Sequence, residues 1–156
     1  MTNEGIHVDD NLQNARELQL LRAGPHWFGI FADEIETTAD WRPPTPLPNA
    51  PAGVLGIVCI RGRMLIALAA YALVDRQAPV TKASKIVALP GDEQVALAVD
   101  EVADTIAVNQ DGLPPAAKDT LVIAKITVGD RFVTILNTNE LFATVMRGHE
   151  RRRRQF

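Results

Sequence analysis

Short apolar runs of strand length alternate with turn residues along most of the chain. Four times, two such runs flank a tight connection that contains glycine, which is the pattern of a β-hairpin. The pairs are Glu17–Arg22 with His26–Phe31, Ile57–Ile60 with Met64–Leu68, Lys85–Leu89 with Gln94–Val99, and Leu121–Val128 with Arg131–Leu136. Four hairpins in 156 residues predict an all-β barrel or sandwich.

One of these runs is predicted to lie in the middle of a sheet. Val95, Leu97 and Val99 alternate with two alanines, so both faces of the run are apolar. An apolar strand face has to be covered by other parts of the protein, and here both faces need cover. We therefore expect Val95–Val99 to be a central, fully buried strand.

Helical signals are confined to two segments. Ala67–Val74 is rich in alanine and leucine, and could hold a short helix after its strand. Asn137–Asn139 offers an N-cap for a terminal helix at Glu140–Met146, and Gly148 stands where a C-cap is expected. The chain is thus predicted to be mainly β, with a short C-terminal helix.

A proline-rich segment interrupts the hairpin pattern. Trp41–Pro51 contains five prolines in eleven residues, and a central strand cannot pass through such a segment. We interpret it as a stiff, extended connection over the surface. Recognition by an SH3 or WW domain is the alternative for a segment of this composition.

Charge is distributed unevenly along a chain of ordinary globular composition. Hydrophobic residues make up 47% and charged residues 22%, which suits one domain with a real core. Residues 147–156 hold five arginines and one glutamate, a net charge of +4. The other 146 residues hold 11 basic and 18 acidic residues, a net charge of −7. The first fourteen residues are polar and aperiodic. We therefore predict a flexible leader at 1–14, a domain at 15–147 and a basic tail at 148–156.

No residue pattern points to catalysis, a metal or a cofactor. The chain lacks a P-loop, a dinucleotide fingerprint, a nucleophile elbow and a zinc helix, and its three histidines are far apart. Asp33, Glu34 and Glu36 form a local acid cluster, which we interpret as a solvated loop or edge. Cys59 lies in an apolar run and is predicted to be an inert core residue. The chain is therefore not expected to be an enzyme.

Membrane insertion and secretion are not expected either. The longest apolar run, Met64–Val74, is about half the length that a membrane-spanning helix needs. The first residues lack the basic and apolar regions of a signal peptide, and a single cysteine excludes an internal disulfide. These features favour a cytoplasmic location for the protein.

A series of motifs resembles the CheW family of chemotaxis coupling proteins. The central motif is the segment 56–65, GIVCIRGRML, which is reached from the proline-containing segment Leu47–Pro51. Phe28–Ile30 is similar to the family's second strand, and Val95–Val102 to its "GlvVDsV" strand and turn. Leu121–Leu141 is similar to the final hairpin that leads into the closing helix. The four motifs stand in the family's order and cover about residues 16–146.

The resemblance implies a fold and a function. The fold would be two small five-stranded β-barrels of SH3-like type, packed together, with a short C-terminal helix. The function would be that of an adaptor that joins the cytoplasmic tips of chemoreceptors, which are methyl-accepting proteins, to a CheA-type histidine kinase. One surface would meet the kinase's own CheW-like regulatory domain and another the receptor helices, with no catalysis, metal or cofactor.

Five residues are carried over as candidate partner-binding positions: Thr37, Gly56, Arg61, Gly62 and Asp100. Each has a simpler structural interpretation beside the functional one. The two glycines can serve a positive φ or a close approach of the backbone. Arg61 can be a solvated turn residue, and Asp100 can cap the turn after its strand.

The chain departs from the family pattern at four positions. The family's glutamate in the third strand is Thr37 here, and Glu36 beside it would face the opposite side of a regular strand. The proline after the Arg-Gly turn is Ile66, and two aspartates are replaced by Ala69 and Asn137. These changes indicate a divergent member with altered partners, for example in a type IV pilus (twitching motility) chemosensory system.

A different class of function remains open through the tail. The four consecutive arginines, Arg151–Arg154, could contact nucleic-acid phosphates or anionic lipids at about 1 kcal/mol each. Because the rest of the chain is acidic, such binding would be weak and would depend strongly on salt. A third class, an enzyme or a small-ligand barrel, is disfavoured because no catalytic constellation supports it.

Overall fold

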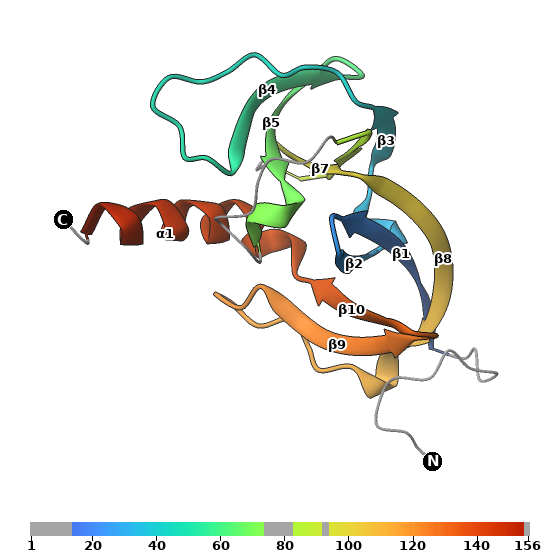
Figure 1. Ribbon diagram of the computed structural model, residues 1–156. Helices are drawn as coiled ribbons and strands as arrows, with labels where there is room; N and C mark the ends of the chain where they lie inside the picture. Colours follow the sequence, from blue (N-terminus) through green and yellow to red (C-terminus); the bar gives the residue numbers. More distant parts are fainter. Residues whose placement is uncertain (1–13, 74–82, 92–93, 155–156) are drawn as a thin grey trace.

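A computed structural model describes residues 14–73, 83–91 and 94–154. These residues form two five-stranded sheets, each curled into a small barrel (Figure 1). The strand order is β8-β1-β2-β10-β9 in the first sheet and β3-β6-β7-β5-β4 in the second. The predicted fold class, two packed five-stranded barrels with a C-terminal helix, is confirmed.

The first barrel is built from both ends of the chain and the second from its middle. The first sheet consists of β1 (Ala15–Ala23), β2 (His26–Phe31), β8 (Glu101–Asn109), β9 (Val122–Val128) and β10 (Arg131–Leu136). The second sheet consists of β3 (Thr37–Asp40), β4 (Val54–Ile60), β5 (Arg63–Ala69), β6 (Lys85–Ala88) and β7 (Val95–Val99). All four predicted hairpins are present as antiparallel pairs. One parallel pair in each sheet, β2 with β10 and β5 with β7, joins the hairpins.

Helical structure in the described residues is short except at the C-terminal end. Four 3-10 turns are η1 (Ala32–Glu34), η2 (Ala70–Leu73), η3 (Gln110–Gly112) and η4 (Thr138–Glu140), and the α-helix α1 covers Leu141–Arg154. The helix expected within 67–74 is only the turn η2, because β5 continues to Ala69. Residues 74 and 1–13, the latter nearly all of the expected leader, lie outside the described residues.

The C-terminal helix differs from the prediction at its end. Before it, Asn137 Oδ1 accepts a hydrogen bond from the Asn139 N–H, as expected of a capping residue. The helix does not stop at Gly148, however, but runs on to Arg154. A glycine inside a helix costs only about 1 kcal/mol relative to alanine, and the arginines that follow are good helix formers. Gly148 is therefore not a C-cap, and the basic segment continues the helix away from the barrels (Figure 1).

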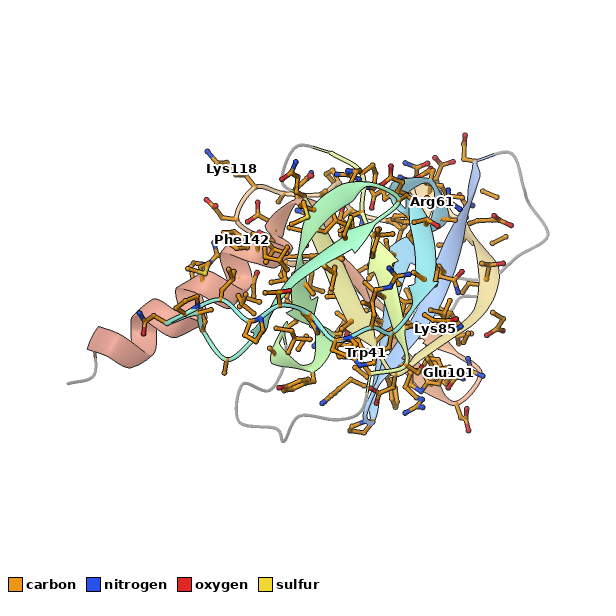
Figure 2. All side chains as sticks on the ribbon, turned by 90° about the horizontal axis from the view of Figure 1, so that it is seen from above. Trp41, Arg61, Lys85, Glu101, Lys118 and Phe142 are labelled. Atoms are coloured by element: carbon orange, nitrogen blue, oxygen red, sulfur yellow. The ribbon has the colours of Figure 1, made fainter. Side chains whose placement is uncertain are left out.

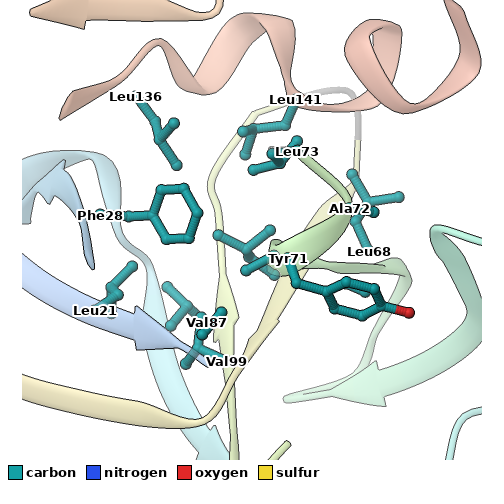
Figure 3. Packing of buried hydrophobic residues seen from close by; sticks show 14 of the residues in the cluster. Leu21, Phe28, Leu68, Tyr71, Ala72, Leu73, Val87, Val99, Leu136 and Leu141 are labelled. Carbon is teal, nitrogen blue, oxygen red and sulfur yellow. The ribbon is translucent and has the colours of Figure 1, made fainter. Parts of the chain in front are cut away.

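The largest hydrophobic cluster lies between the two barrels (Figure 3). Phe28 and Leu21 of the first sheet face Val87 and Val99 of the second, and Leu141 of α1 covers one end. Each barrel also has a smaller cluster inside it. Because the main core is shared, the two barrels are expected to unfold as one unit.

Strand β7 serves two of these cores at once. All five of its residues are buried, as predicted, and it is the central strand of its sheet. Leu97 points into the cluster between the barrels, whereas Ala96 belongs to the cluster inside the second barrel. The large side chains of β7 thus fill the shared core, and the small Ala96 fits the interior of the second barrel.

We expect Leu97→Ala to lower the free energy of unfolding by about 2–5 kcal/mol, because Leu97 is fully buried and the smaller side chain leaves a cavity. Thermal or urea unfolding followed by circular dichroism measures this loss. A melting temperature equal to that of the wild type would show that β7 does not serve the shared core.

Candidate partner-binding site

The hairpin of β4 and β5 ends in a two-residue turn formed by Arg61 and Gly62. Ile60 and Arg63 pair across its base, and φ is +52° at Arg61 and +80° at Gly62. Two positive φ angles define a type I′ turn, whose twist suits a two-residue hairpin. Glycine takes this conformation freely, whereas a residue with a Cβ atom pays roughly 1–2 kcal/mol for it. An arginine is therefore held at this tip against its backbone preference.

The Arg61 side chain is exposed at this tip. Within the part of the chain that the structure describes, it makes no hydrogen bond or ion pair. Its charge is therefore available to another molecule.

Two exposed side chains extend this surface along the outer side of the hairpin. Cys59 and Met64 pair across the two strands, and Met64 is 59% exposed. The prediction that Cys59 is a core residue is wrong, because its neighbours Val58 and Ile60 point into the barrel and alternation turns Cys59 outward. We call Cys59, Arg61 and Met64 the hairpin face.

Gly56 shapes the start of the same hairpin through its backbone. The pairing of β4 with β5 shifts register between Val54 and Gly56, and φ at Gly56 is +138°. A Cβ atom there would lie 2.2 Å from the carbonyl oxygen of Thr45. Thr45 itself exchanges two 2.8 Å backbone hydrogen bonds with Ile57. Gly56 thus lets the proline-rich segment lie against β4, which matches the backbone interpretation of this glycine.

The acid next to the family's position, Glu36, pairs with an arginine that the sequence analysis did not consider. Thr37 is the first residue of β3, is half-buried and pairs with Ala88. Glu36, one residue earlier, forms an ion pair with Arg63 rather than with Arg61. The sequence reasoning missed Arg63, although the alternation of β5 places it on the same side of the strand as the buried Leu65.

Asp100 lies at the junction of the two barrels rather than on the hairpin face. It is the single residue between β7 and β8, where the chain crosses from one sheet to the other. Its carboxylate accepts a 2.8 Å hydrogen bond from the Gly24 N–H and lies 3.8 Å from the Arg22 guanidinium. Its neighbour Glu101 and Arg61 stand on different sides of the molecule (Figure 2). Asp100 therefore ties the β1–β2 turn to the crossover.

Two of the departures from the family pattern are accommodated inside the fold. The Ile66 N–H donates a 2.8 Å hydrogen bond to the Gln94 carbonyl, a bond that a proline could not make. Ala69 is 3% exposed at the end of β5, in the cluster between the barrels. Ile66 is half-buried and packs against the same cluster.

The third such position, Asn137, is a buried polar residue that organises its surroundings. It is 5% exposed, and its Nδ2 donates to the carbonyls of Ala117 and Thr120 at 3.1 and 3.0 Å. A carboxylate has no hydrogen to donate to these carbonyls, so an asparagine suits this place. Asn137 holds the loop before β9 against the start of α1.

The acid cluster at η1 is held by one arginine of β1. Arg16 pairs with Asp33 at 2.7 Å and with Glu34 at 3.4 Å, and it stacks on the Phe31 ring. Hydrogen bonding from Arg16 holds the pKa of Asp33 below its usual value. The two acids are thus paired at a partly solvated edge.

Close to this edge, a pocket of about 520 Å³ opens between Arg16, Glu34, Asp111, Leu113 and Pro115. It lies in the first barrel, whereas the hairpin face belongs to the second.

Metal binding and membrane crossing find no support in the described part of the chain. No group of three or more histidine, cysteine, aspartate or glutamate side chains is placed there to hold a metal ion. Among the same residues, no helix has the length and apolar character that crossing a bilayer requires.

The chain belongs to the CheW-like domain family, whose model matches residues 17–146. It is 32% identical to a chemotaxis protein CheW of Rhizobium meliloti (strain 1021) over 117 residues, or 74% of each chain. It is 27% identical to a probable chemotaxis protein CheW of Rhizobium etli over 139 residues, which cover 84% of this chain and 90% of that one.

The scaffolding protein TtCheW of Thermoanaerobacter tengcongensis has a similar structure. The TM-score is 0.69 at 17% identity, over 87% of this chain and 93% of the other. This likeness supports the two-barrel fold.

Replacement of Arg61 by asparagine should stabilise the protein by about 0.5–1 kcal/mol, because Asn-Gly is the preferred sequence of a type I′ turn. Chemical denaturation of the two proteins side by side measures the difference. Lower stability of Arg61→Asn would mean that the arginine side chain makes a stabilising contact that outweighs its backbone strain.

Asn137→Asp should destabilise the fold by about 2–4 kcal/mol at neutral pH, because a buried carboxylate would face two carbonyl oxygens. This environment raises the pKa of the new carboxyl in the folded state. The loss is therefore complete above that pKa and is relieved as the pH falls below it. Unfolding experiments across a pH series test both parts.

Asn109→Asp is the matched control, because the half-buried Asn109 side chain only accepts a hydrogen bond, from the Asp111 N–H. A carboxylate can do the same, and little change is expected. An equal loss of stability in the two variants would contradict the role assigned to the Asn137 amide.

Proposed function

We propose that the protein is an adaptor that couples chemoreceptors to a CheA-type histidine kinase in a chemotaxis pathway. Membership of the CheW-like family and the two curated CheW relatives support this role. The observation that carries it is the hairpin face, where Arg61 stands exposed beside Met64 and Cys59. Its partners would be the kinase and the cytoplasmic tip of a methyl-accepting receptor, so we also propose a cytoplasmic location.

Within this proposal, the candidate residues have different tasks. Arg61 contacts the partner, and Gly62 allows the turn that presents it. Gly56 seats the proline-rich segment against β4, and Thr37 starts the edge strand that flanks the hairpin. Asp100 acts from a distance by holding the two barrels together.

An adaptor with two partners needs two surfaces, and the first barrel offers a second one. Phe132 of β10 is 79% exposed, the most exposed large hydrophobic side chain among the described residues. Beside it, Arg131 stacks over Trp27 at 4.3 Å and lies 3.5 Å from Asp104. Exposed aromatic residues next to an ordered arginine are typical of protein interfaces. We propose that the two barrels bind different partners through these surfaces.

The basic end of α1 is the basis of a second candidate function. The helix carries residues 151–154, all arginine, away from the barrels (Figure 1). Anionic lipids or nucleic acids are the molecules that such a segment would attract. Both curated relatives are chemotaxis proteins by name, which favours the adaptor over this candidate and over a pilus system.

The adaptor role predicts opposite outcomes for two variants. Arg61→Glu should weaken binding to the pathway's kinase or receptor by about tenfold or more while the protein stays folded, because it reverses a charge at the interface. Truncation after Gly148 should leave that affinity within about twofold, because an exposed basic tail acts mainly on the association rate. Calorimetric titration of both variants against each partner measures these effects.

Loss of binding in the truncated protein together with normal binding of Arg61→Glu would place the interface in the tail. A salt titration of the wild type against DNA and anionic vesicles then distinguishes the adaptor function from binding of nucleic acid or anionic lipid by the tail.

A further inference from the structure

The side chain of Arg63 connects the base of the β4–β5 hairpin to two other segments. Its guanidinium pairs with the Glu36 carboxylate, just before β3. It also donates hydrogen bonds to the carbonyl of Leu89, after β6, at 3.3 Å and to that of Gly91 at 3.1 Å. One arginine thus holds the hairpin against the opposite side of the second barrel.

This contact matters because the barrel is not closed by strand pairing at this place. Strands β3 and β4 are the two edges of their sheet, and no backbone pairing joins them in the described residues. From the segment that follows β3, the backbone of Thr45 pairs with Ile57 of β4, and Arg42 donates a 3.3 Å hydrogen bond to the Cys59 carbonyl. Beyond Ile57, the direction in which the tip of the hairpin points therefore depends on side-chain contacts such as those of Arg63.

The same pair decides which charge the hairpin presents. Arg63 is 27% exposed, and its charge is compensated by Glu36. Arg61, two residues earlier, is exposed and has no such partner among the described residues. The hairpin face therefore displays one uncompensated positive charge next to the apolar side chain of Met64. A surface of this kind fits a partner that offers a carboxylate beside an apolar residue.

We infer that Glu36 and Arg63 are a positioning pair, which holds the hairpin so that Arg61 meets a carboxylate of the partner. The inference rests on the proposed function and deepens it. The acid that lies one residue before the family's position has an arginine of its own, and Arg61 is left for an intermolecular contact. Glu36 and Arg63 themselves need not touch the partner.

Binding of the wild type and four variants to the kinase and to the receptor tip tests this inference. Glu36→Gln and Arg63→Gln should each lower the affinity for one partner by about twofold to fivefold, the range of a partly exposed ion pair. The double variant should lose no more affinity than the single variant that binds less tightly, because both changes break the same contact. Arg63→Lys should recover part of the loss, because it keeps the charge.

Asp40→Asn is the matched control. It removes the ion pair of Asp40 with Lys85, which is at the opposite end of β3 from Glu36. Its affinity should equal that of the wild type, with all proteins measured at a temperature at which they are folded. Wild-type affinity in both glutamine variants, or an equal loss in the control, would overturn the inference.

Hydrogen exchange of the protein alone provides the second readout, which does not need the partner. The backbone amides of 59–64 should exchange several-fold faster in Glu36→Gln than in the wild type or in Asp40→Asn. If the wild type binds neither partner, the proposed function fails, and unchanged exchange would separately overturn the positioning role.

Discussion

The apolar contact between the two barrels is the constraint on which the rest of the structure depends. Each barrel is too small to bury many side chains, and the cluster that they share is larger than either barrel's own. Leu97 and Phe28 enter this cluster from different sheets. Separation of the barrels would expose these side chains to water, at about 25 cal/mol per Å² of apolar surface. Both candidate surfaces, one on each barrel, are therefore held in a common frame.

The hydrophobic pattern predicted the hairpins and the central strand of this frame, the family resemblance implied its two packed barrels, and neither predicted its surface. Alternation and glycine turns identified every hairpin, and the two apolar faces of 95–99 identified the central strand. The exposure of Cys59 was missed because every residue of Ile57–Ile60 is apolar. A run of this kind does not reveal which of its side chains point outward. The helix end was missed because Gly148 signals a cap only when the next residues cannot continue the helix, and arginines can.

The resemblance to a family located the hairpin, whereas its electrostatics had to come from the structure. By analogy with the family, the sequence placed Thr37, and not Glu36, at the position of the glutamate near Arg61, and it gave no reason to single out Arg63. Which arginine meets which acid is decided by how an unpaired sheet edge lies against the hairpin. A contact of this kind is long-range, and no local spacing predicts it.

The departures from the family pattern fall into two physical classes. At Ile66 and Asn137 the substituted residue makes hydrogen bonds that the family's residue could not make, so the change is absorbed within the fold. At Thr37 the lost carboxylate is at a partly exposed edge, and a different pair, Glu36 with Arg63, is present there instead. Buried changes alter stability, while this edge change alters the charge that the hairpin shows to a partner. The hairpin and its flanking strand are therefore the place to test the altered partner choice that the departures suggested, because an arginine is kept there at a strained turn that stability alone would not favour.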